Sequence, residues 1–386
     1  MIIAQIGTFP EHINRIKGGI EASVSGLSFA MTKENRIFVF DTPRNELEND
    51  FVEKIDNVTI YRYHGEGNNF KSLKRIQKIF KDIEKINPDI CHIHGSGYLQ
   101  NKLFKVLSAK NHKVIVTIHG LQHIEKKKEL TKKRSVRSLL KYYLLSKSEF
   151  EIIENSKNII VDTKYVEDQI IEYRNQKKIK KTPQIAIIPQ GIDQHYFSIK
   201  RNPIDSVLLC VGAISRRKGQ LKLLECFHEI LKSSVNVKLI IAGFISEREY
   251  YDELLFEIKE RGLEDYVTVF TQNDQEDIFR LYSRASLFVL YSAEESQGIV
   301  LAEAMATGLP VVATNVGGIP YVVENNINGF LSNYDDQSEF TSNIGLLLTD
   351  MDLYKRISTI NKNSALKFDW NVIADQILKV YNSTSR

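Results

Sequence analysis

Residues 291–315 read YSAEESQGIVLAEAMATGLPVVATN and contain the pattern of a strand, a short loop, a helix and a second strand. The first apolar strand ends near Tyr291, and an acidic turn that includes Gly298 follows it. A helix-forming run then extends from 299 to 306, and a second apolar run extends from 310 to 314. A strand–loop–helix junction points backbone N–H groups and the positive end of the helix dipole above the sheet. The stretch therefore predicts an α/β fold with an anion site at this loop.

Apolar runs separated by amphipathic stretches recur along the whole chain. One such stretch, 70–86, has Leu73, Ile76, Ile79, Phe80 and Ile83 on one helical face. Strands that alternate with helices favour a parallel sheet with right-handed crossovers. We therefore expect two Rossmann-like, doubly wound parallel-sheet domains that face a central cleft. The expected strands are 2–6, 36–40, 58–61, 90–93, 114–118, 158–161, 185–188, 207–211, 237–242, 267–270, 287–291 and 310–314.

The chain of 386 residues is too long for one compact core, because domains average about 150 residues. A polar stretch from 198 to 206 separates the two sets of strands. We expect an N-terminal domain at 1–197 and a C-terminal domain at 205–369. The last amphipathic segment, 370–386, could pack on either domain, and packing on the first would return the chain to the N-terminal domain. Open α/β sheets bind ligands at the carboxyl ends of their strands, so we place the chemistry in the cleft.

The composition is that of an ordinary globular protein, with 42% apolar and 26% charged residues. We find neither a membrane-spanning apolar run nor a signal peptide, which predicts a cytoplasmic protein. Cys91, Cys210 and Cys226 lie in apolar runs and are expected to be buried thiols in a reducing compartment. The net charge of +4 is too small to indicate nucleic acid as the main partner.

Glu295 and Glu303 form an E-x7-E pattern, which is followed by AMATGLPVVAT and by Gly317-Gly318-Ile319-Pro320. This set resembles the retaining glycosyltransferases of family 4, which have the GT-B fold. One E-x7-E alone would be a weak signal, but an ordered set over most of the chain is specific. The other matching motifs are Gly18-Gly19-Ile20-Glu21, His94 in DICHIHG, His119 in VIVTIHGL, Pro189 to Asp193 in IPQGID, and Lys218-Gly219 in VGAISRRKG.

The resemblance implies an enzyme that moves a hexose-type sugar from a nucleotide-diphosphate sugar to a carbohydrate or lipid-linked acceptor. It implies a role in bacterial cell-surface polysaccharide synthesis. The donor would bind to the C-terminal domain and the acceptor to the N-terminal one. The family retains the anomeric configuration by front-face displacement, in which the leaving phosphate oxygen helps to deprotonate the acceptor hydroxyl.

In the family the first Glu of the pair contacts donor-sugar hydroxyls and the second holds the nucleotide ribose, so the resemblance gives these roles to Glu295 and Glu303. The backbone around Gly298, Ile299 and Val300 would receive the diphosphate. Recognition of the base is expected after the third strand of the second domain, at Phe270, Thr271 and Gln272.

Lys218 follows the first strand of the second domain and can reach the cleft as a point charge on a phosphate. A fixed cation there stabilises the departing diphosphate more in the transition state than in the ground state. Related sequences usually carry an Arg after the strand-end glycine, where this chain has Ala213. Arg216 or Arg217 could supply the missing guanidinium, or the diphosphate could be held by fewer contacts.

Gly18 and Gly19 follow the first strand, and glycine permits close approach of a phosphate to the backbone. The pattern is not GxGxxG, which disfavours a dinucleotide cofactor. The resemblance implies that this loop approaches the donor phosphate and the acceptor. His119 ends an apolar strand, and the resemblance places it in the catalytic site beside the donor sugar. There it would hydrogen-bond hydroxyls and would not act as a nucleophile.

We expect neither a metal nor a cofactor. Asp350-Met351-Asp352 matches the Asp-x-Asp that holds a divalent cation in the other major glycosyltransferase fold, but it starts a helical run, where acids act as caps. His92 and His94 share a strand face without a third ligand at zinc-like spacing. Lys218, an arginine and helix starts would neutralise the diphosphate.

The most basic stretch is 125–147, and within it Val136, Leu139, Leu140, Tyr143 and Leu144 fall on one helical face. Residues 126–147 could form a patch that meets anionic lipids on the inner face of the membrane. They could equally form a core helix with a solvated basic rim. The resemblance favours membrane or acceptor contact, because many relatives extend lipid-linked sugars.

Other functions are compatible with the same fold. A nucleotide-sugar epimerase would need acid and base groups in the cleft, and a phosphorylase would need a lysine-bound pyridoxal phosphate. A non-catalytic sugar-binding protein would not need Lys218 and Glu295, and both are present.

Overall fold

A computed structural model describes residues 1–13, 16, 18–41, 49–64, 69–125, 136–179, 183–202, 206–232, 236–271 and 274–384, without the side chains of 69–73, 137 and 138. The chain divides into two compact units. The first comprises Met1–Ile13, Lys17–Gly191 and Trp370–Arg386, and the second comprises Asn14–Ile16 and Ile192–Asp369.

The second unit begins at Ile192, so residues 192–197 differ from their sequence assignment to the first domain. Local pairing explains this boundary. The N–H of Ile192 donates to the carbonyl oxygen of Phe368 at 2.8 Å, and Ile192 pairs with Asp369 in a β-bridge. Tyr196 is buried in the hydrophobic core of the second unit.

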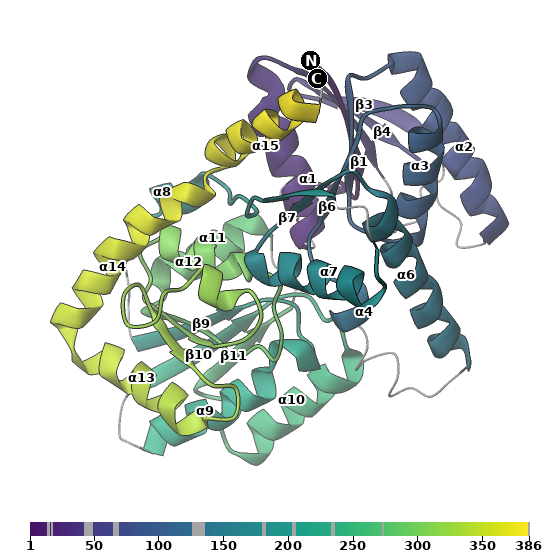
Figure 1. The fold of residues 1–386 in the computed structure, drawn as a ribbon. Helices are drawn as coiled ribbons and strands as arrows, with labels where there is room; N and C mark the ends of the chain where they lie inside the picture. The colour runs from purple at the N-terminus through teal and green to yellow at the C-terminus, as the bar shows by residue number, and fades with distance from the viewer. Residues whose placement is uncertain are drawn as a thin grey trace. The chain divides into compact units, whose positions relative to one another are not determined.

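An eight-stranded sheet forms the centre of the first unit, in the order β3-β4-β2-β1-β5-β6-β7-β8 (Figure 1). The strand order reverses between β1 and β5. Strands β5 and β6 are buried along their whole length, as expected of a sheet covered on both faces. The strands are β1 (Ile2–Gly7), β2 (Arg36–Asp41), β3 (Phe51–Ile55), β4 (Val58–Arg62), β5 (Ile90–His94), β6 (Val114–Ile118), β7 (Asn158–Val161) and β8 (Gln184–Ile187).

Helices accompany these strands at nearly every crossover. In α2 the predicted face is buried at Ile76, Ile79 and Ile83, while Phe80 is partly buried. The helices of the first unit are α1 (Gly19–Ala30), α2 (Asn69–Ile86), α3 (Tyr98–Ala109), α4 (Gln122–Glu125), α6 (Val136–Asn155), α7 (Lys164–Gln176) and α15 (Trp370–Thr384), with a 3-10 turn at Met31–Lys33. No helix in the described part of the chain is long and apolar enough to span a bilayer.

A six-stranded parallel sheet forms the centre of the second unit, in the order β11-β10-β9-β12-β13-β14. The strand order reverses between β9 and β12. The strands are β9 (Ser206–Val211), β10 (Val237–Ala242), β11 (Val267–Phe270), β12 (Leu287–Leu290), β13 (Val311–Thr314) and β14 (Phe330–Ser332). The helices are α8 (His195–Ser198), α9 (Gln220–Lys232), α10 (Arg248–Glu260), α11 (Gln275–Arg284), α12 (Ile299–Ala306), α13 (Gln337–Thr349) and α14 (Met351–Ala365), with 3-10 turns at Arg216–Lys218, Ile319–Tyr321 and Leu366–Phe368.

The structure contains two strands that the sequence analysis missed. β3 pairs antiparallel with β4 through a tight turn at Asp56, where φ is 51°. It lies at the sheet edge with Phe51 and Val52 exposed, so it lacks the buried apolar run that marks the other strands. β14 is only three residues long, which is too short to show a period in the sequence. The two-domain doubly wound fold is confirmed, with one antiparallel edge strand in the first sheet.

The C-terminal helix α15 belongs to the first unit and lies beside α1 (Figure 1). Its first residue, Trp370, packs over two glycines. A Cβ on Gly26 of α1 would lie 2.1 Å from Trp370 Nε1, and one on Gly191 would lie 2.4 Å from Trp370 Cδ2. The indole therefore occupies space that any larger residue at these positions would fill.

Gly26→Ala is expected to destabilise the first unit by about 1–3 kcal/mol, the usual cost of overpacking. This exceeds the gain of about 1 kcal/mol in helix propensity. The matched control is Gly345→Ala in α13, where a Cβ meets no atom within 4 Å and should raise stability by up to about 1 kcal/mol. Thermal unfolding of both variants checks this, and a Gly26→Ala protein as stable as the wild type would contradict the packing.

Candidate active site

The loops after β9 and β12 lie where the strand order of the second sheet reverses. Open α/β sheets bind ligands at such a point. The first loop passes through the 3-10 turn at Arg216–Lys218, and the second leads into α12. Both loops carry residues that the sequence analysis selected.

Lys218 and Glu295 form an ion pair that joins these loops, with side chains only 11% and 6% exposed. Ser292 Oγ donates to Glu295 Oε1 at 2.9 Å, and Arg217 Nη1 lies 3.4 Å from Glu295 Oε2. Burial alone would raise the pKa of Glu295, but the charges of Lys218 and Arg217 outweigh it and lower the pKa below its usual value. Glu295 is therefore an ionised carboxylate that accepts from three groups.

The contacts of the two neighbouring arginines decide which of them lies in the site. Arg216 Nη2 is 2.7 Å from Glu253 Oε2, and its guanidinium lies 5.3 Å from the centre of the Tyr250 ring. Both partners are in α10, so Arg216 is directed to that helix. Arg217 Nη1 instead donates to the backbone oxygen of Glu294 at 3.1 Å, beside its contact with Glu295. Arg217 is thus the arginine that accompanies Lys218.

Two glycines shape the loop that carries Glu295. A Cβ on Gly317, where φ is 55°, would lie 2.1 Å from the carbonyl oxygen of Glu295, and a Cβ on Gly318 would lie 1.8 Å from that of Ser296. The N–H of Gly318 donates to the carbonyl oxygen of Glu295 at 2.7 Å. Gly317 and Gly318 therefore allow the close backbone contact that holds the loop at Glu295.

Helix α12 begins at Ile299, directly after Gly298, which caps it with a φ of 78°. That left-handed conformation favours glycine. The first N–H groups of an α-helix have no partner within the helix, and here they belong to Ile299 and Val300. The predicted helix start is therefore present shortly after Glu295 in the sequence.

Glu303 lies further along α12 and is partly buried. Tyr282 Oη donates to Glu303 Oε2 at 2.9 Å, and Tyr196 also hydrogen-bonds this carboxyl group. Burial raises the pKa of Glu303 to about 7, although the two hydroxyl groups and the charge of Lys218 lower it. The two glutamates of the motif thus have opposite pKa shifts, because Glu295 forms ion pairs with Lys218 and Arg217, whereas burial is the largest effect on Glu303.

The loop expected to contact the base is only partly described. Phe270 ends β11 and is 40% exposed, and Thr271 follows it. Gln272 lies outside the described residues.

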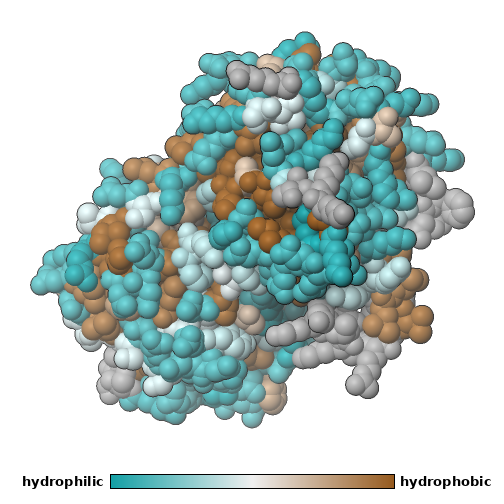
Figure 2. Space-filling model, in the orientation of Figure 1, coloured by the Kyte–Doolittle hydropathy of each residue, from teal (hydrophilic) through white to brown (hydrophobic). Residues whose placement is uncertain are grey.

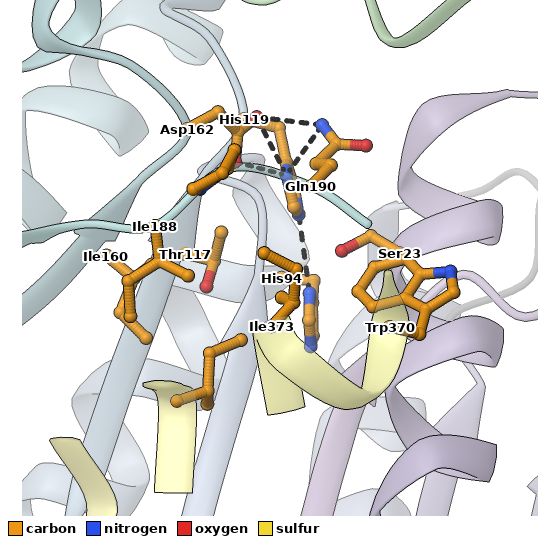
Figure 3. A pocket seen from close by; sticks show the side chains of 12 residues that line it. Ser23, His94, Thr117, His119, Ile160, Asp162, Ile188, Gln190, Trp370 and Ile373 are labelled. Carbon is orange, nitrogen blue, oxygen red and sulfur yellow. Dashed lines mark hydrogen bonds and ion pairs between the residues drawn. The ribbon is translucent and has the colours of Figure 1, made fainter. Parts of the chain in front are cut away.

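The first unit holds a second group of sequence-selected residues around His119, which follows β6 (Figure 3). Its ring lies between Asp162 and Gln190 on one side and His94 on the other. His119 Nδ1 is 3.2 Å from Asp162 Oδ2 and 3.1 Å from Gln190 Nε2. His119 Nε2 is 3.3 Å from His94 Nδ1. The adjoining cavity has room for about one water molecule, about 10 Å³.

Gly18 and Gly19 stand at the start of α1 in the same unit. Gly18 is extended, with a φ of 178°, so its backbone conformation does not require glycine. A Cβ on Gly18 would meet no atom within 4 Å, and one on Gly19 would lie 3.4 Å from Gln190 Oε1. Within the described part of the chain, neither backbone strain nor packing therefore requires glycine at position 18, and a Cβ at position 19 would only be in ordinary contact with Gln190.

Several residues of the two groups were missed by the sequence analysis. Asp162 follows the carboxyl end of β7, a position that could have marked it. Gln190 follows β8 and lies within the IPQGID motif, but the sequence analysis gave it no role. Tyr196 and Tyr282 carried no such signal, because they reach Glu303 from distant segments. Glu149 of α6 was also missed: it is fully buried and accepts from the N–H groups of Gln122 and His123, the first two residues of α4.

Family models match both units of the chain. Residues 17–196 match the model described as "Glycosyltransferase Family 4", and residues 192–364 match "Glycosyl transferases group 1". The chain belongs to glycosyltransferase family 4. Among curated proteins, this family 4 chain is 26% identical over 249 residues to D-inositol 3-phosphate glycosyltransferase of Segniliparus rotundus, covering 62% of the chain and 55% of that protein. The chain spans about half the length of the curated relatives it matches.

Solved structures show that the family 4 chain has the GT-B fold. Sucrose-phosphate synthase from Thermosynechococcus elongatus matches with a TM-score of 0.79 at 22% identity, covering 99% of this chain and 98% of that one. HepE from Anabaena, solved with UDP and glucose, matches with a TM-score of 0.73 at 17% identity, covering 98% and 99%. At these identities the likeness concerns the fold alone.

The raised pKa of Glu303 predicts a stability effect with a defined sign. Between pH 4.5 and about 7 the folded protein keeps a proton that the unfolded chain has lost. The contribution of this carboxyl to stability therefore falls as the pH rises through that window. Glu303→Gln should remove this fall, and Tyr282→Phe should extend it to higher pH, because the hydroxyl that favours the ionised form is gone.

Denaturant unfolding at a series of pH values, compared among the wild type and the two variants, measures these effects. A Glu303→Gln protein with the same pH dependence as the wild type would show that this carboxyl titrates near its ordinary value.

Proposed function

We propose that this protein is a retaining, metal-independent glycosyltransferase that transfers a hexose-type sugar from a nucleotide-diphosphate sugar to a carbohydrate or lipid-linked acceptor. The observation that carries the proposal is the cluster of Lys218, Arg217 and Glu295, with Glu295 in the loop that leads into α12. Two cations, helix N–H groups and an ionised carboxylate together suit a ligand with a diphosphate at one end and hydroxyl groups beside it.

In this proposal Lys218, Arg217 and the N–H groups of Ile299 and Val300 bind the diphosphate. Glu295 accepts from donor-sugar hydroxyls, since its lowered pKa keeps it ionised. The ion pair holds Lys218 in place before the donor arrives, so little reorganisation is needed on binding.

Glu303 would bind the ribose through its carboxyl oxygens, with Tyr196 and Tyr282 holding its orientation. Phe270, Thr271 and Gln272 would contact the base. Gly18, Gly19 and His119 of the first unit would contact the donor phosphate, the donor sugar and the acceptor. Arg216 has no donor-binding role in this proposal, because Glu253 and Tyr250 engage it.

The proposed reaction breaks the bond between the anomeric carbon and the donor phosphate oxygen. The acceptor oxygen forms its bond on the same face of that carbon, and the acceptor proton passes to the leaving phosphate oxygen. Negative charge grows on the nucleoside diphosphate as it leaves, and the cations beside it stabilise this charge in the transition state. The same cations supply the neutralisation for which other transferases use a metal, so activity should persist in excess chelator.

The relatives' names are compatible with a phosphorylated acceptor and with a nucleotide-sugar donor. D-inositol 3-phosphate glycosyltransferase is named for a phosphorylated polyol, and HepE was solved with UDP and with UDP-glucose. A role in cell-surface polysaccharide synthesis remains part of the proposal. A panel of nucleotide sugars with candidate acceptors would identify both substrates, with release of the nucleoside diphosphate as the readout.

Lys218→Ala and Glu295→Gln are each expected to lower turnover at least about 100-fold, the scale of losing one preorganised electrostatic contact. Lys222→Ala is the matched control, since Lys222 is half-exposed and forms an ion pair with Glu225 on the surface of α9. Steady-state kinetics on folded variants measures the effect. Wild-type turnover in both site variants would place the chemistry elsewhere.

We also propose that α6 attaches the protein to an anionic membrane surface. Val136, Leu139, Leu140, Tyr143 and Leu144 are between 41% and 82% exposed, so they do not form a core stripe. Figure 2 shows hydrophobic colour at the surface where α6 lies in Figure 1. The helix instead buries a different face, with Glu149, Ile152 and Ile153.

Charge favours an anionic bilayer as the partner of this stripe. Lys141 and Lys147 are exposed on the same helix, and residues 126–135, which precede it and contain six lysines and arginines, lie outside the described part. Apolar side chains bordered by basic ones are typical of helices that lie at a membrane interface.

Replacing Leu139, Leu140 and Tyr143 by Ser should reduce co-sedimentation with vesicles of anionic lipid several-fold without loss of folding, because these side chains are already exposed. The control replaces Leu255 and Phe256, which are exposed on α10 in the second unit. Binding that persists in the triple variant, or binding of the wild type that does not weaken with salt, would contradict this attachment.

A further inference from the structure

A chain of buried polar side chains leads from the C-terminal helix α15 to His119. Gln5 Nε2 of β1 donates to Tyr381 Oη of α15 at 3.2 Å. Gln5 Oε1 lies 2.8 Å from His94 Nε2, and His94 Nδ1 lies 3.3 Å from His119 Nε2. Tyr381, Gln5 and His94 are fully buried. The connection spans nearly the whole sequence within the first unit.

Each hydrogen bond in this chain fixes the direction of the next. The Gln5 amide uses its nitrogen on Tyr381, so its oxygen can only accept from His94, which places the His94 ring hydrogen on Nε2. His94 Nδ1 then carries a lone pair and accepts from His119, which places a hydrogen on His119 Nε2. Reversal of the first bond would reverse all of them.

Burial keeps the intermediate rings neutral. The pKa of His94 lies well below its usual value because of burial and the neighbouring rings of His92 and His119. Burial also lowers the pKa of His92 to about 3. A neutral imidazole has one donor and one acceptor nitrogen. The direction of the bond between His94 and Gln5 therefore determines the direction of the bond between His94 and His119.

A second branch supports the same direction. Tyr381 Oη accepts from Gln5, so its own hydrogen is available to His92 Nδ1, 2.7 Å away. His92 Nε2 then carries the ring hydrogen and donates to Thr117 Oγ1 at 2.6 Å. Tyr381 is therefore the common origin of both branches.

We propose that Tyr381 is a positioning residue for His119, which acts through Gln5 and His94 to keep a hydrogen on His119 Nε2. The other nitrogen, His119 Nδ1, then accepts from Gln190 Nε2 at 3.1 Å, and Gln190 Nε2 also donates to Asp162 Oδ2 at 2.7 Å (Figure 3). Asp162 Oδ2 can only accept and lies 3.2 Å from His119 Nδ1, so it favours the competing form with the hydrogen on Nδ1, which the measurement below distinguishes. The consequence for turnover rests on the proposed glycosyltransferase function, in which His119 contacts the donor sugar. The assignment of the ring hydrogens does not rest on it.

The test is nitrogen NMR of the full-length protein with ¹⁵N-labelled histidine rings, with His94 and His119 assigned from the spectra of His94→Asn and His119→Asn. In the wild type both rings should carry hydrogen on Nε2. In Tyr381→Phe the Gln5 amide loses its acceptor and can turn over, so both rings should become mixtures of the two neutral forms or shift to Nδ1. Tyr354→Phe is the matched control, because its hydroxyl donates to the carbonyl oxygen of Ser286 in the second unit and touches no histidine.

Tyr381→Phe should also lower kcat about tenfold, the effect of losing one net hydrogen bond, with the donor KM and the melting temperature close to those of Tyr354→Phe. Wild-type rings with hydrogen on Nδ1 would overturn the proposal without any variant. Unchanged spectra in Tyr381→Phe, or changed spectra with an unchanged kcat, would overturn it as well. If no nucleotide sugar is turned over by the wild type, the proposed function fails, and the wild-type and Tyr381→Phe spectra alone decide the positioning role.

Discussion

The buried ion pair between Lys218 and Glu295 is the interaction on which the candidate site depends. A buried charge without a partner costs several kcal/mol, so each of the two side chains requires the other. The pair connects loops that are far apart in the sequence but follow neighbouring strands, β9 and β12. The backbone under Glu295 is set by Gly317 and Gly318, which leave no space for a side chain. The position of the Lys218–Glu295 pair therefore depends on the turn at Gly317 and Gly318, which holds the loop that leads into α12.

The sequence predicted this part of the molecule well because its signals are local. The strand–loop–helix order predicted the bounds of α12. The motif spacing selected both glutamates, and their roles in binding stay predictions. The local sequence does not show which of Arg216 and Arg217 lies beside Lys218. That depends on Glu253 in α10, which forms an ion pair with Arg216. The tyrosines around Glu303 come from segments with no motif. Edge strand β3 was missed because its exposed residues lack the apolar run of a buried strand.

The first unit shows the limit of motif reasoning more strongly. His119 and His94 were found from their strand ends, but Gln5 and Tyr381 are ordinary residues in the sequence, 376 positions apart. Only the packing of α15 against the unit brings them together. The direction of each hydrogen bond in this series of side chains depends on all the others, since each neutral ring both donates and accepts. No spacing rule on one segment can predict it.

Gly191 and Trp370 touch, and just beyond them the N–H of Ile192 bonds to the oxygen of Phe368. The segment Ile192–Asp369, which is the second unit apart from Asn14–Ile16, therefore begins and ends at neighbouring residues. Because the two ends of this segment lie close together, it can be exchanged for its counterpart from a related protein through two neighbouring junctions. The N-terminal and C-terminal segments of the first unit stay unchanged in such an exchange. Under the proposed function, such an exchange would replace the donor-binding residues of the second unit and leave the residues of the first unit unchanged.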